Sequence, residues 1–239
     1  MTRLSVNLNK VALIRNSRGA NQPDLIQVAK DCEAFGAQGI TVHPRPDQRH
    51  VRFDDLPQLK SIVTTEFNVE GNPTRDFIDM VLSCKPHQVT FVPDKPGALT
   101  SDAGWDTIKE KDFLVDVLQA FKNQGIRTSL FVGANPKMVH GAKVCGADRV
   151  ELYTGPYAKN FEKDKEYAIS DFIVAANEAE NIDIGLNAGH DLNLRNLFYF
   201  RRTLTNLLEV SIGHALIIDS LYYGLNNTIQ MYLDCLNKG

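Results

Sequence analysis

The chain has 239 residues, of which 43% are hydrophobic and 23% charged, and its formal net charge is −3 at pH 7. This length and composition suit one large globular domain over residues 1–239 and exclude the disordered class. The net charge gives no reason to expect a nucleic-acid partner.

Two further classes are disfavoured by the sequence. No apolar run approaches the roughly 20 residues that span a bilayer, and the N-terminus lacks the basic start and apolar stretch of a signal peptide. We therefore expect a cytoplasmic protein without a membrane partner. The four cysteines stand singly, without a C-x-x-C pair, and are expected to be reduced packing residues: Cys32, Cys84, Cys145 and Cys235.

The N-terminal half begins with a short strand over residues 4–7 and a polar, basic loop over residues 9–19. Pro23 then opens a helix, because a first helical turn tolerates its missing N–H, and Gly36 ends that helix. The alternation continues with strands over residues 40–43, 66–70 and 88–92 and helices over residues 56–63 and 72–84.

The C-terminal half repeats this alternation. A long connection over residues 93–106 comes first, and we expect it to serve as a lid or binding loop. Strands follow over residues 128–132, 149–153, 184–187 and 208–212. Helices are expected over residues 110–123, 136–145, 163–181, 194–202 and 216–236.

Eight strands that alternate with helices predict parallel pairing, and eight such units in about 250 residues are the dimensions of a closed (β/α)8 barrel. We therefore expect an α/β fold of the TIM-barrel class with additional helices. The alternative is an open doubly wound sheet. No G-x-G-x-x-G follows the first strand and no phosphate-loop lysine motif occurs, which disfavours that alternative.

A basic loop follows the second expected strand. Pro44 and Pro46 prevent a regular continuation of the strand. Within eight residues the loop carries His43, Arg45, Arg49 and His50. Residues 1–52 hold eight Lys or Arg against four Asp or Glu, a balance of +4, so that the remainder carries −7. This basic patch on an acidic protein indicates a small anionic ligand, although a solvated basic turn is the alternative for the loop alone.

Polar residues occur where the expected strands end, which is where barrel enzymes carry their reacting groups. Strands end at Asn7, His43 and Glu70, and two strands are followed directly by His190 and His214. Glu151 lies within the strand expected over residues 149–153. His87 precedes a strand and His140 lies on a helix, so we assign them no chemistry. For any single histidine the alternative is a hydrogen-bonded core residue, and the joint placement favours a site.

Two segments have the same form, an apolar strand followed by a glycine and a histidine. They are Gly189-His190 and Gly213-His214. Glycine lets the backbone approach a ligand closely, and the loops after strands seven and eight of such barrels often bind phosphate through backbone amides. The two segments therefore predict phosphate binding.

With these residues in hand, the chain resembles the pyridoxine 5'-phosphate synthase family, over nearly its whole length. The resemblance is carried by residues 6–7, 15–19, 39–43, 49–50, 68–70, 85–87, 187–190 and 212–215. It implies a (β/α)8 barrel that works as a homo-oligomer, commonly an octamer, without a metal or organic cofactor. It also implies the reaction of 3-amino-2-oxopropyl phosphate with 1-deoxy-D-xylulose 5-phosphate to give pyridoxine 5'-phosphate, inorganic phosphate and water.

The resemblance also implies residue roles. His43 and Glu70 accept protons, and His190 donates one. The deoxyxylulose phosphate is held by Arg45, His50 and Thr100, with Asn9 and Lys10 beside it. The aminoketone phosphate is held by Asn7, Arg18, Gly213 and His214, with Arg18 supplied by a neighbouring subunit. Glu151 and Asp191 complete the substrate-binding set.

These roles make chemical sense, because imine formation, phosphate elimination, enolisation, ring closure and dehydration all move protons. Histidine acts in both directions near neutral pH, and a carboxylate becomes a useful base when burial raises its pKa. Arginine supplies forked donors to phosphate, and the glycine loops supply backbone N–H groups.

The chain departs from the family pattern at two places. Many members have Asp-His where this chain has Asn9-Lys10, so an amide and a cation lie beside the deoxyxylulose phosphate. The family usually has glycine where this chain has Asp191. We expect the Asp191 side chain to point away from the phosphate and to offer only its backbone N–H.

Three other functions are alternatives. A metal-dependent barrel hydrolase with ligands among the histidines and Glu70 lacks the H-x-H pair that often ends strand one, where Asn7 stands. A Schiff-base aldolase lacks an evident lysine within a strand. A non-enzymatic phosphosugar-binding protein remains the third, and an activity measurement distinguishes it.

Overall fold

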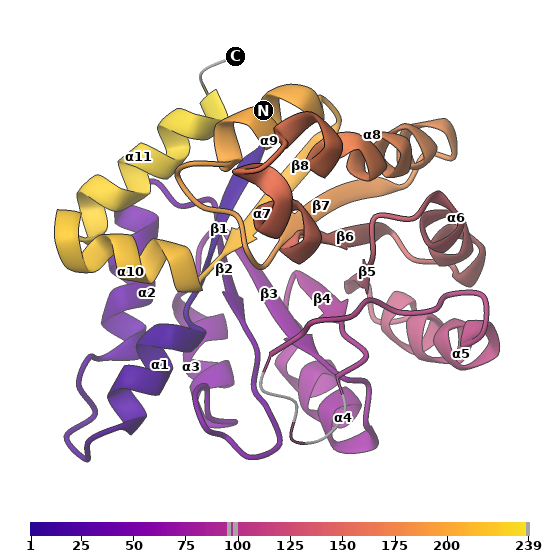
Figure 1. The fold of residues 1–239 in the computed structure, drawn as a ribbon. Coiled ribbons are helices and arrows are strands. Elements are labelled where there is room, and N and C mark those ends of the chain that lie inside the picture. The colour runs from indigo at the N-terminus through magenta and orange to yellow at the C-terminus, as the bar shows by residue number, and fades with distance from the viewer. Residues whose placement is uncertain (95–96, 98–99, 238–239) are drawn as a thin grey trace.

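The computed structural model describes residues 1–94, 97 and 100–237. In this part of the chain, eight parallel strands pair in sequence order, and the last pairs with the first to close a barrel (Figure 1). The strands are β1 (Arg3–Asn7), β2 (Gly39–Val42), β3 (Glu66–Gly71), β4 (Gln88–Phe91), β5 (Arg127–Val132), β6 (Arg149–Tyr153), β7 (Gly185–Gly189) and β8 (Leu207–Ile212). The predicted TIM-barrel fold is therefore confirmed.

Helices surround the barrel on all sides (Figure 1). They are α1 (Asn9–Asn16), α2 (Leu25–Ala34), α3 (Asp55–Ile62), α4 (Arg75–Cys84), α5 (Lys111–Lys122), α6 (Pro136–Cys145), α7 (Gly155–Phe161), α8 (Lys165–Asn181), α9 (Leu197–Thr203), α10 (His214–Tyr223) and α11 (Leu225–Asn237). None of these described helices combines the length and the apolar character that crossing a bilayer requires.

The first helix corrects a prediction. Residues 9–19 were expected to form a loop, but Asn9–Asn16 is helical, with Val11, Ala12 and Arg15 buried on one face. Its apolar face is short, and the third buried position is an arginine, which the helical pattern alone does not mark as an inward residue.

Three further boundaries differ from the expectation. Pro23 precedes α2 and does not open it, because the Asp24 side chain accepts hydrogen bonds from the first-turn N–H groups of Ile26 and Gln27. The helix α7 was not expected, since its Gly155-Pro156 start is typical of a loop. The single helix expected over residues 216–236 is two helices, because Gly224 adopts a φ of +77°.

The long connection over residues 93–106 was expected to be a lid or binding loop. Residues 95–96 and 98–99 of it lie outside the described residues, as do residues 238–239. The later part packs on the barrel, where the indole N–H of Trp105 donates to the Phe91 carbonyl and its backbone N–H to the Phe131 carbonyl.

The interior of the barrel is polar, whereas the hydrophobic core lies between the strands and the helices. In β3, Asn68 faces the interior and accepts from the Thr90 hydroxyl at 3.1 Å, while Phe67 and Val69 belong to the outer core. A second interior pair joins the Ser5 and Thr41 hydroxyls at 2.7 Å. Successive strand residues thus alternate between the polar lumen and the apolar layer.

Charged side chains close the N-terminal end of the barrel. Glu66 forms ion pairs with Arg3, at 3.2 Å, and with Arg127. Arg149 lies 4.0 Å from the same carboxylate. In barrels of this class this end contributes stability, so we assign these groups a structural role.

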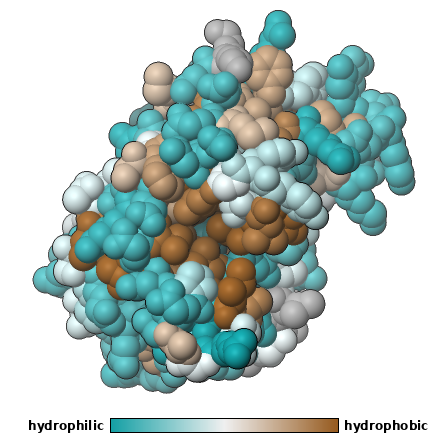
Figure 2. Space-filling model, turned by 90° about the vertical axis from the view of Figure 1, so that its left-hand side faces the viewer, coloured by the Kyte–Doolittle hydropathy of each residue, from teal (hydrophilic) through white to brown (hydrophobic). Residues whose placement is uncertain are grey.

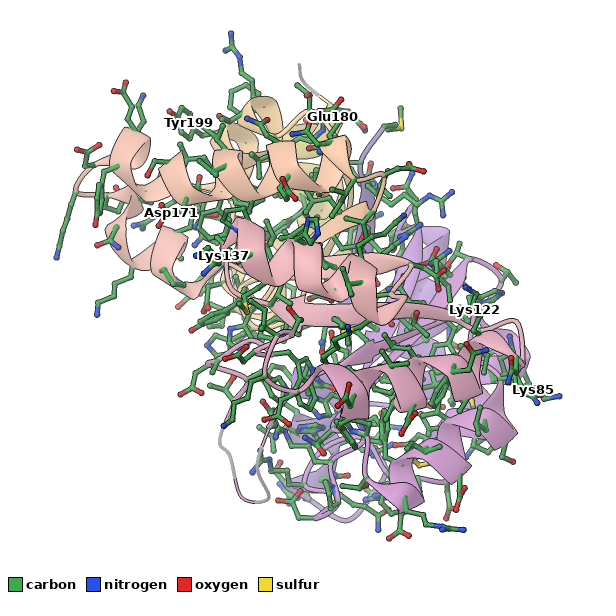
Figure 3. All side chains as sticks on the ribbon, turned by 90° about the vertical axis from the view of Figure 1, so that its right-hand side faces the viewer. Lys85, Lys122, Lys137, Asp171, Glu180 and Tyr199 are labelled. Atoms are coloured by element: carbon green, nitrogen blue, oxygen red, sulfur yellow. The ribbon has the colours of Figure 1, made fainter. Side chains whose placement is uncertain are left out.

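The outer helices present charged side chains to solvent on one side of the molecule. Lys137, Asp171 and Glu180 project away from the barrel there (Figure 3). The opposite side, formed by α1, α2, α3, α10 and α11, gathers hydrophobic side chains near its middle (Figure 2).

Candidate active site

Polar residues meet at the C-terminal ends of the strands. The Asn7 side-chain amide donates to Glu70 Oε2 at 3.3 Å, which joins β1 to β3 across the mouth. A Cβ added to Gly213 would lie 3.0 Å from the Asn7 carbonyl oxygen, so the glycine lets β8 and β1 approach closely. The residues of this rim are Asn7, His43, Glu70, Glu151, His190 and Gly213.

His43 and Glu70 form the central pair of the site. Nδ1 of His43 lies 3.9 Å from Glu70 Oε2; the His43 side chain is buried, and that of Glu70 is 12% exposed. Burial, followed by the charge of Arg45, holds the pKa of His43 well below its usual value. Burial, followed by the charge of Asp94, raises the pKa of Glu70 to about 8. A neutral imidazole and a carboxyl group that ionises near neutral pH are both suited to accepting protons.

Asp94 is a site residue that the sequence analysis did not identify. Its Oδ2 forms an ion pair with Arg45 Nη2 at 2.7 Å and accepts from the Ser101 hydroxyl, also at 2.7 Å. The ion pair holds the guanidinium of Arg45 at the edge of a cavity of about 630 Å³, which His43 also lines. The rule that identified His43, a polar residue just beyond a strand, applies equally to Asp94 after β4.

His50 is buried, and its ring meets that of His43 edge-on, with centroids 6.2 Å apart. Its Nδ1 accepts from the Val51 N–H at 3.0 Å, so the proton of the neutral ring lies on Nε2, where it can be donated to an anion. Burial, followed by the charges of Arg45 and Arg49, lowers the pKa of His50 to about 4. With this pKa, His50 is neutral at pH 7 and can serve as a hydrogen-bond donor but not as a cation.

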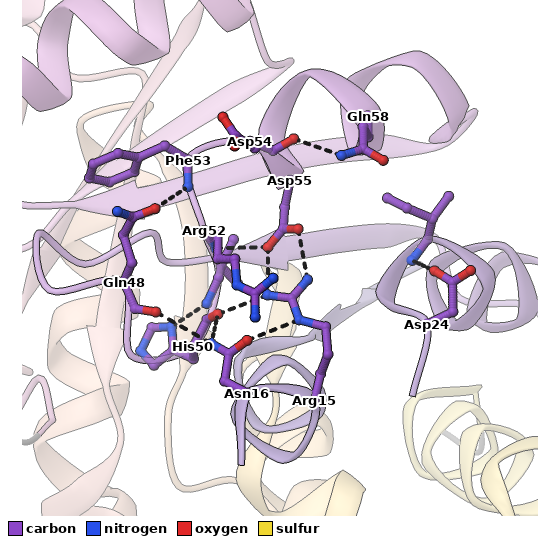
Figure 4. Close-up of polar contacts among 12 residues, drawn as sticks. Arg15, Asn16, Asp24, Gln48, His50, Arg52, Phe53, Asp54, Asp55 and Gln58 are labelled. Carbon is purple, nitrogen blue, oxygen red and sulfur yellow. Dashed lines mark hydrogen bonds and ion pairs between the residues drawn. The ribbon is translucent and has the colours of Figure 1, made fainter. Parts of the chain in front are cut away.

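A buried network anchors the loop that carries His50 (Figure 4). Arg15 pairs with both oxygens of Asp55, at 2.7 and 2.9 Å, and also donates to the His50 carbonyl at 3.1 Å. The Asn16 amide donates to the same carbonyl at 2.6 Å. Asp55 further accepts from the Arg52 N–H at 2.7 Å. The end of α1 and the β2–α3 loop are thus fixed to each other.

Replacing Arg15 by methionine is expected to destabilise the protein by about 3–5 kcal/mol, because the substitution leaves the buried carboxylate of Asp55 without its counter-charge. Urea denaturation measures this loss. The matched control is Arg195→Met, because Arg195 forms an exposed ion pair with Glu162 at 3.8 Å and such pairs contribute about 0–1 kcal/mol. Equal losses for both variants would contradict the anchoring role.

Asn9 and Lys10 contribute to the site in different ways. Asn9 Oδ1 accepts from the His43 N–H at 2.8 Å, and its own N–H donates to Asn7 Oδ1 at 3.0 Å. The amide thus orients two rim residues. Lys10 is half-buried, and its charge is among those that lower the pKa of His50. The replacement of an Asp-His pair by Asn9-Lys10 is therefore compatible with an ordered rim.

Glu151 reaches the mouth from within the barrel. It is 3% exposed, and its Oε2 has no hydrogen-bond partner among the described protein groups. A Cβ added to Gly189 would overlap Glu151 Oε1, so a side chain at this position would displace the Glu151 carboxyl group. Burial, followed by the charge of Glu70, raises the pKa of Glu151 well above its usual value. A neutral carboxyl group can donate a hydrogen bond into the site.

His190 follows β7, and each of its two ring nitrogens contacts a neighbouring side chain. Its Nε2 lies 2.6 Å from the Thr100 hydroxyl, and its Nδ1 lies 2.7 Å from Asp191 Oδ2. The expectation that the Asp191 side chain points away from the phosphate and offers it only the backbone N–H stays a prediction, and the structure adds a contact that the sequence did not reveal. The carboxylate binds the His190 ring, and the Asp191 N–H donates to Thr154 Oγ1 at 3.2 Å.

The remaining residues singled out in the sequence are exposed or have other contacts. His214 is exposed in the first turn of the ten-residue helix α10, directly after Gly213. Arg18 is exposed beyond the end of α1. His87 Nδ1 accepts from the Phe67 N–H at 2.9 Å, and His140 pairs with Glu178 on the outer surface. In the described part of the chain, His, Cys, Asp and Glu side chains form no group of three that could hold a metal ion.

The sequence is similar to those of known proteins over nearly its whole length. The family model of the pyridoxal phosphate biosynthesis protein PdxJ matches residues 4–238. The pyridoxine 5'-phosphate synthase of Cytophaga hutchinsonii is 60% identical, over 100% of both chains. That of Bacteroides thetaiotaomicron is 58% identical, over 99% of this chain and 100% of the relative.

Solved structures resemble the fold at much lower identity. Phosphoribosylanthranilate isomerase of Thermotoga maritima superposes with a TM-score of 0.62 at 11% identity, over 100% of both chains. Thiamine phosphate pyrophosphorylase of Pyrococcus furiosus superposes with a TM-score of 0.61 at 11% identity, over 99% of this chain and 96% of the other. These likenesses concern the barrel fold alone.

Proposed function

Because the chain belongs to the family of the pyridoxal phosphate biosynthesis protein PdxJ, we propose that its barrel mouth carries out the pyridoxine 5'-phosphate synthase reaction. In that reaction 3-amino-2-oxopropyl phosphate condenses with 1-deoxy-D-xylulose 5-phosphate to give pyridoxine 5'-phosphate, inorganic phosphate and water. The observation that carries the proposal is the pair of the buried His43 and the largely buried Glu70, two groups suited to accepting protons beside the buried Arg45.

The deoxyxylulose phosphate binds on the side of the β2–α3 loop. Arg45 supplies a guanidinium, and His50 supplies a neutral Nε2–H donor. Thr100 contributes a hydroxyl from the far side, while Lys10 adds positive charge and Asn9 holds His43 in place. This arrangement matches the basic N-terminal part of the chain to an anionic substrate.

The aminoketone phosphate binds where β8 meets β1. The backbone N–H groups at Gly213 and His214 open the helix α10, and a helix N-terminus favours an anion. The Asn7 amide adds a donor beside Glu70. Each of the two phosphate groups thus has its own set of donors.

Other residues, located between the two proposed phosphate sites, transfer protons to and from the substrates. His43 and Glu70 take protons from the substrates, and His190 returns one to a leaving oxygen. The buried carboxyl group of Glu151 donates a hydrogen bond to the reacting chain, because the shift in its pKa keeps it neutral. The chemical contribution of these side chains is proton transfer and hydrogen bonding, and the proposal includes no metal or organic cofactor.

We propose that the enzyme is a homo-oligomer, an octamer, in which Arg18 completes the aminoketone phosphate site of a neighbouring subunit. Apolar side chains on α1 and α10 support an interface on the side of the molecule that carries Arg18. They include Leu13 and Ile14 at 41% and 47% exposure and Leu221 at 74%. Figure 2 faces this side and shows hydrophobic residues gathered near its middle.

The remaining parts of the proposal concern the chain as a whole. One catalytic domain over residues 1–239 is supported by the barrel, whose first and last strands come from opposite ends of the chain. A cytoplasmic location is supported by the free cysteines, which suit a reducing compartment.

The test is to mix both proposed substrates with the purified protein and to follow inorganic phosphate and pyridoxine 5'-phosphate. Both products are expected in equal amounts, and omitting either substrate is expected to prevent their formation. Binding of the substrates without turnover would favour a phosphosugar-binding protein. Phosphate release from a single substrate, together with a stoichiometric metal in elemental analysis, would favour a hydrolase.

A further inference from the structure

The imidazole of His190 is held at both of its ring nitrogens. Nδ1 lies 2.7 Å from Asp191 Oδ2, and Nε2 lies 2.6 Å from Thr100 Oγ1. An ionised carboxylate can only accept a hydrogen bond, so the ring hydrogen next to Asp191 belongs to Nδ1. The neutral ring therefore accepts from Thr100 at Nε2, and the charged ring carries its second proton there.

We propose that Asp191 is a positioning residue, which fixes the tautomer and orientation of His190 so that Nε2 is the nitrogen that carries and releases the catalytic proton. The carboxylate also stabilises the imidazolium form that precedes each proton donation. This inference rests on the proposed function, in which His190 is the proton donor. It gives Asp191 a role toward His190 in place of contact with a substrate phosphate.

The backbone of Asp191 is held by groups other than its own carboxylate. Its N–H donates to Thr154 Oγ1 at 3.2 Å, and the Thr154 hydroxyl donates to the Gly189 carbonyl at 2.7 Å. Its carbonyl accepts from the side-chain amides of Asn193 and Asn196, both at 3.4 Å. A substitution of the Asp191 side chain therefore leaves the loop its other attachments.

The ring of His190 is also constrained by a neighbouring aromatic ring and by its own backbone conformation. The Tyr153 ring meets it edge-on, with centroids 5.5 Å apart and an interplanar angle of 81°. The φ of His190 is +97°, a conformation that residues other than glycine rarely adopt. Such strain persists only where the surroundings enforce it, and it is common at functional sites. The backbone of His190 and the carboxylate of Asp191 thus both fix the orientation of the His190 imidazole.

The first readout is the separation of kcat from KM. Asp191→Asn keeps the shape of the side chain and removes its charge. We expect kcat to fall by about 10–100-fold, the range found for carboxylates that orient metal-bound histidines, while the KM of each substrate changes less than about threefold. Asp191→Glu restores the carboxylate and is expected to recover part of the loss.

The matched control is Asp183→Asn. Asp183 lies near the opposite end of β7, is exposed and has a φ of +54°, which asparagine tolerates. This variant removes the same charge from the same strand region without touching His190. Its kcat is expected to equal that of the unsubstituted enzyme.

The second readout does not depend on activity. Solid-state NMR of protein labelled with 15N-histidine reports the protonation of each ring nitrogen, and only six histidines contribute. The His190 signals are assigned by their loss in His190→Asn. We expect one Nδ1–H tautomer in the unsubstituted protein and a new Nε2–H signal in Asp191→Asn, because an amide can pair with either tautomer.

The outcomes separate the two proposals. Unchanged tautomer signals and an unchanged kcat in Asp191→Asn would overturn the positioning role. A raised KM with an unchanged kcat would also overturn it and would make Asp191 a substrate-binding residue. If the unsubstituted protein makes no pyridoxine 5'-phosphate, the proposed function fails, while the tautomer measurement still decides whether Asp191 orients His190.

Discussion

Replacing Glu70 by glutamine is expected to lower kcat/KM by about 10²–10⁴-fold, the contribution typical of a general base. Glutamine keeps the shape of the side chain and its bond from Asn7, but it cannot accept a proton. Glu166→Gln, an exposed glutamate on α8, is the control and is expected to keep full activity. A Glu70→Gln variant within threefold of the unsubstituted enzyme would contradict the assigned role.

The pH profile gives a second readout for Glu70. Because the pKa of this carboxyl group is raised to about 8, the fraction that is ionised grows as the pH rises towards that value. We expect kcat/KM to rise over the same range and this limb to disappear in Glu70→Gln. The raised pKa also means that ionising Glu70 opposes folding, so its cost to stability grows between about pH 4.5 and 8. The glutamine variant avoids this cost and is expected to be at least as stable at pH 8.

Replacing His190 by asparagine is expected to lower kcat severely while substrate binding remains largely intact. The loss of a general acid costs about 10²–10⁴-fold. Asparagine is chosen because it tolerates a positive φ better than most residues, so the loop keeps its conformation. Calorimetric titration with each substrate and steady-state assays measure the two effects separately.

His140→Asn is the matched control for this substitution, since His140 lies on the outer surface against Glu178. It is expected to leave both binding and turnover unchanged. Complete loss of binding in His190→Asn, with an intact circular dichroism spectrum, would mean that the residue holds the substrate and does not donate a proton.

The strands were predictable because each is a short apolar segment between turn signals. All eight lie within two residues of their expected bounds, as β6 (Arg149–Tyr153) illustrates. The helix α1 was missed for a physical reason. Its buried Arg15 is satisfied by Asp55, forty positions away in the sequence, and no local pattern reveals a partner at that distance.

The site was predictable where a residue's position along a strand decides its place, as it does for His43, Glu70 and His190. Contacts that depend on loop geometry were not predictable. The contact of the Asp191 carboxylate with the His190 ring, beside a positive φ at His190, was not foreseen. Asp94 reaches Arg45 across two loops. Such pairs follow from the path of the backbone, which a strand-by-strand interpretation does not provide.

The contact between Gly213 and Asn7 joins the earliest-made and latest-made strands of the polypeptide. A ribosome that has passed β7 and just made His190 has also made His43 and Glu70, but half of the proposed donors for the aminoketone phosphate, Gly213 and His214, are still untranslated. An anion bound by both segments would therefore link the first and last strands of the barrel. Because it binds only when these strands are paired, its binding free energy adds to the free energy of unfolding of the barrel.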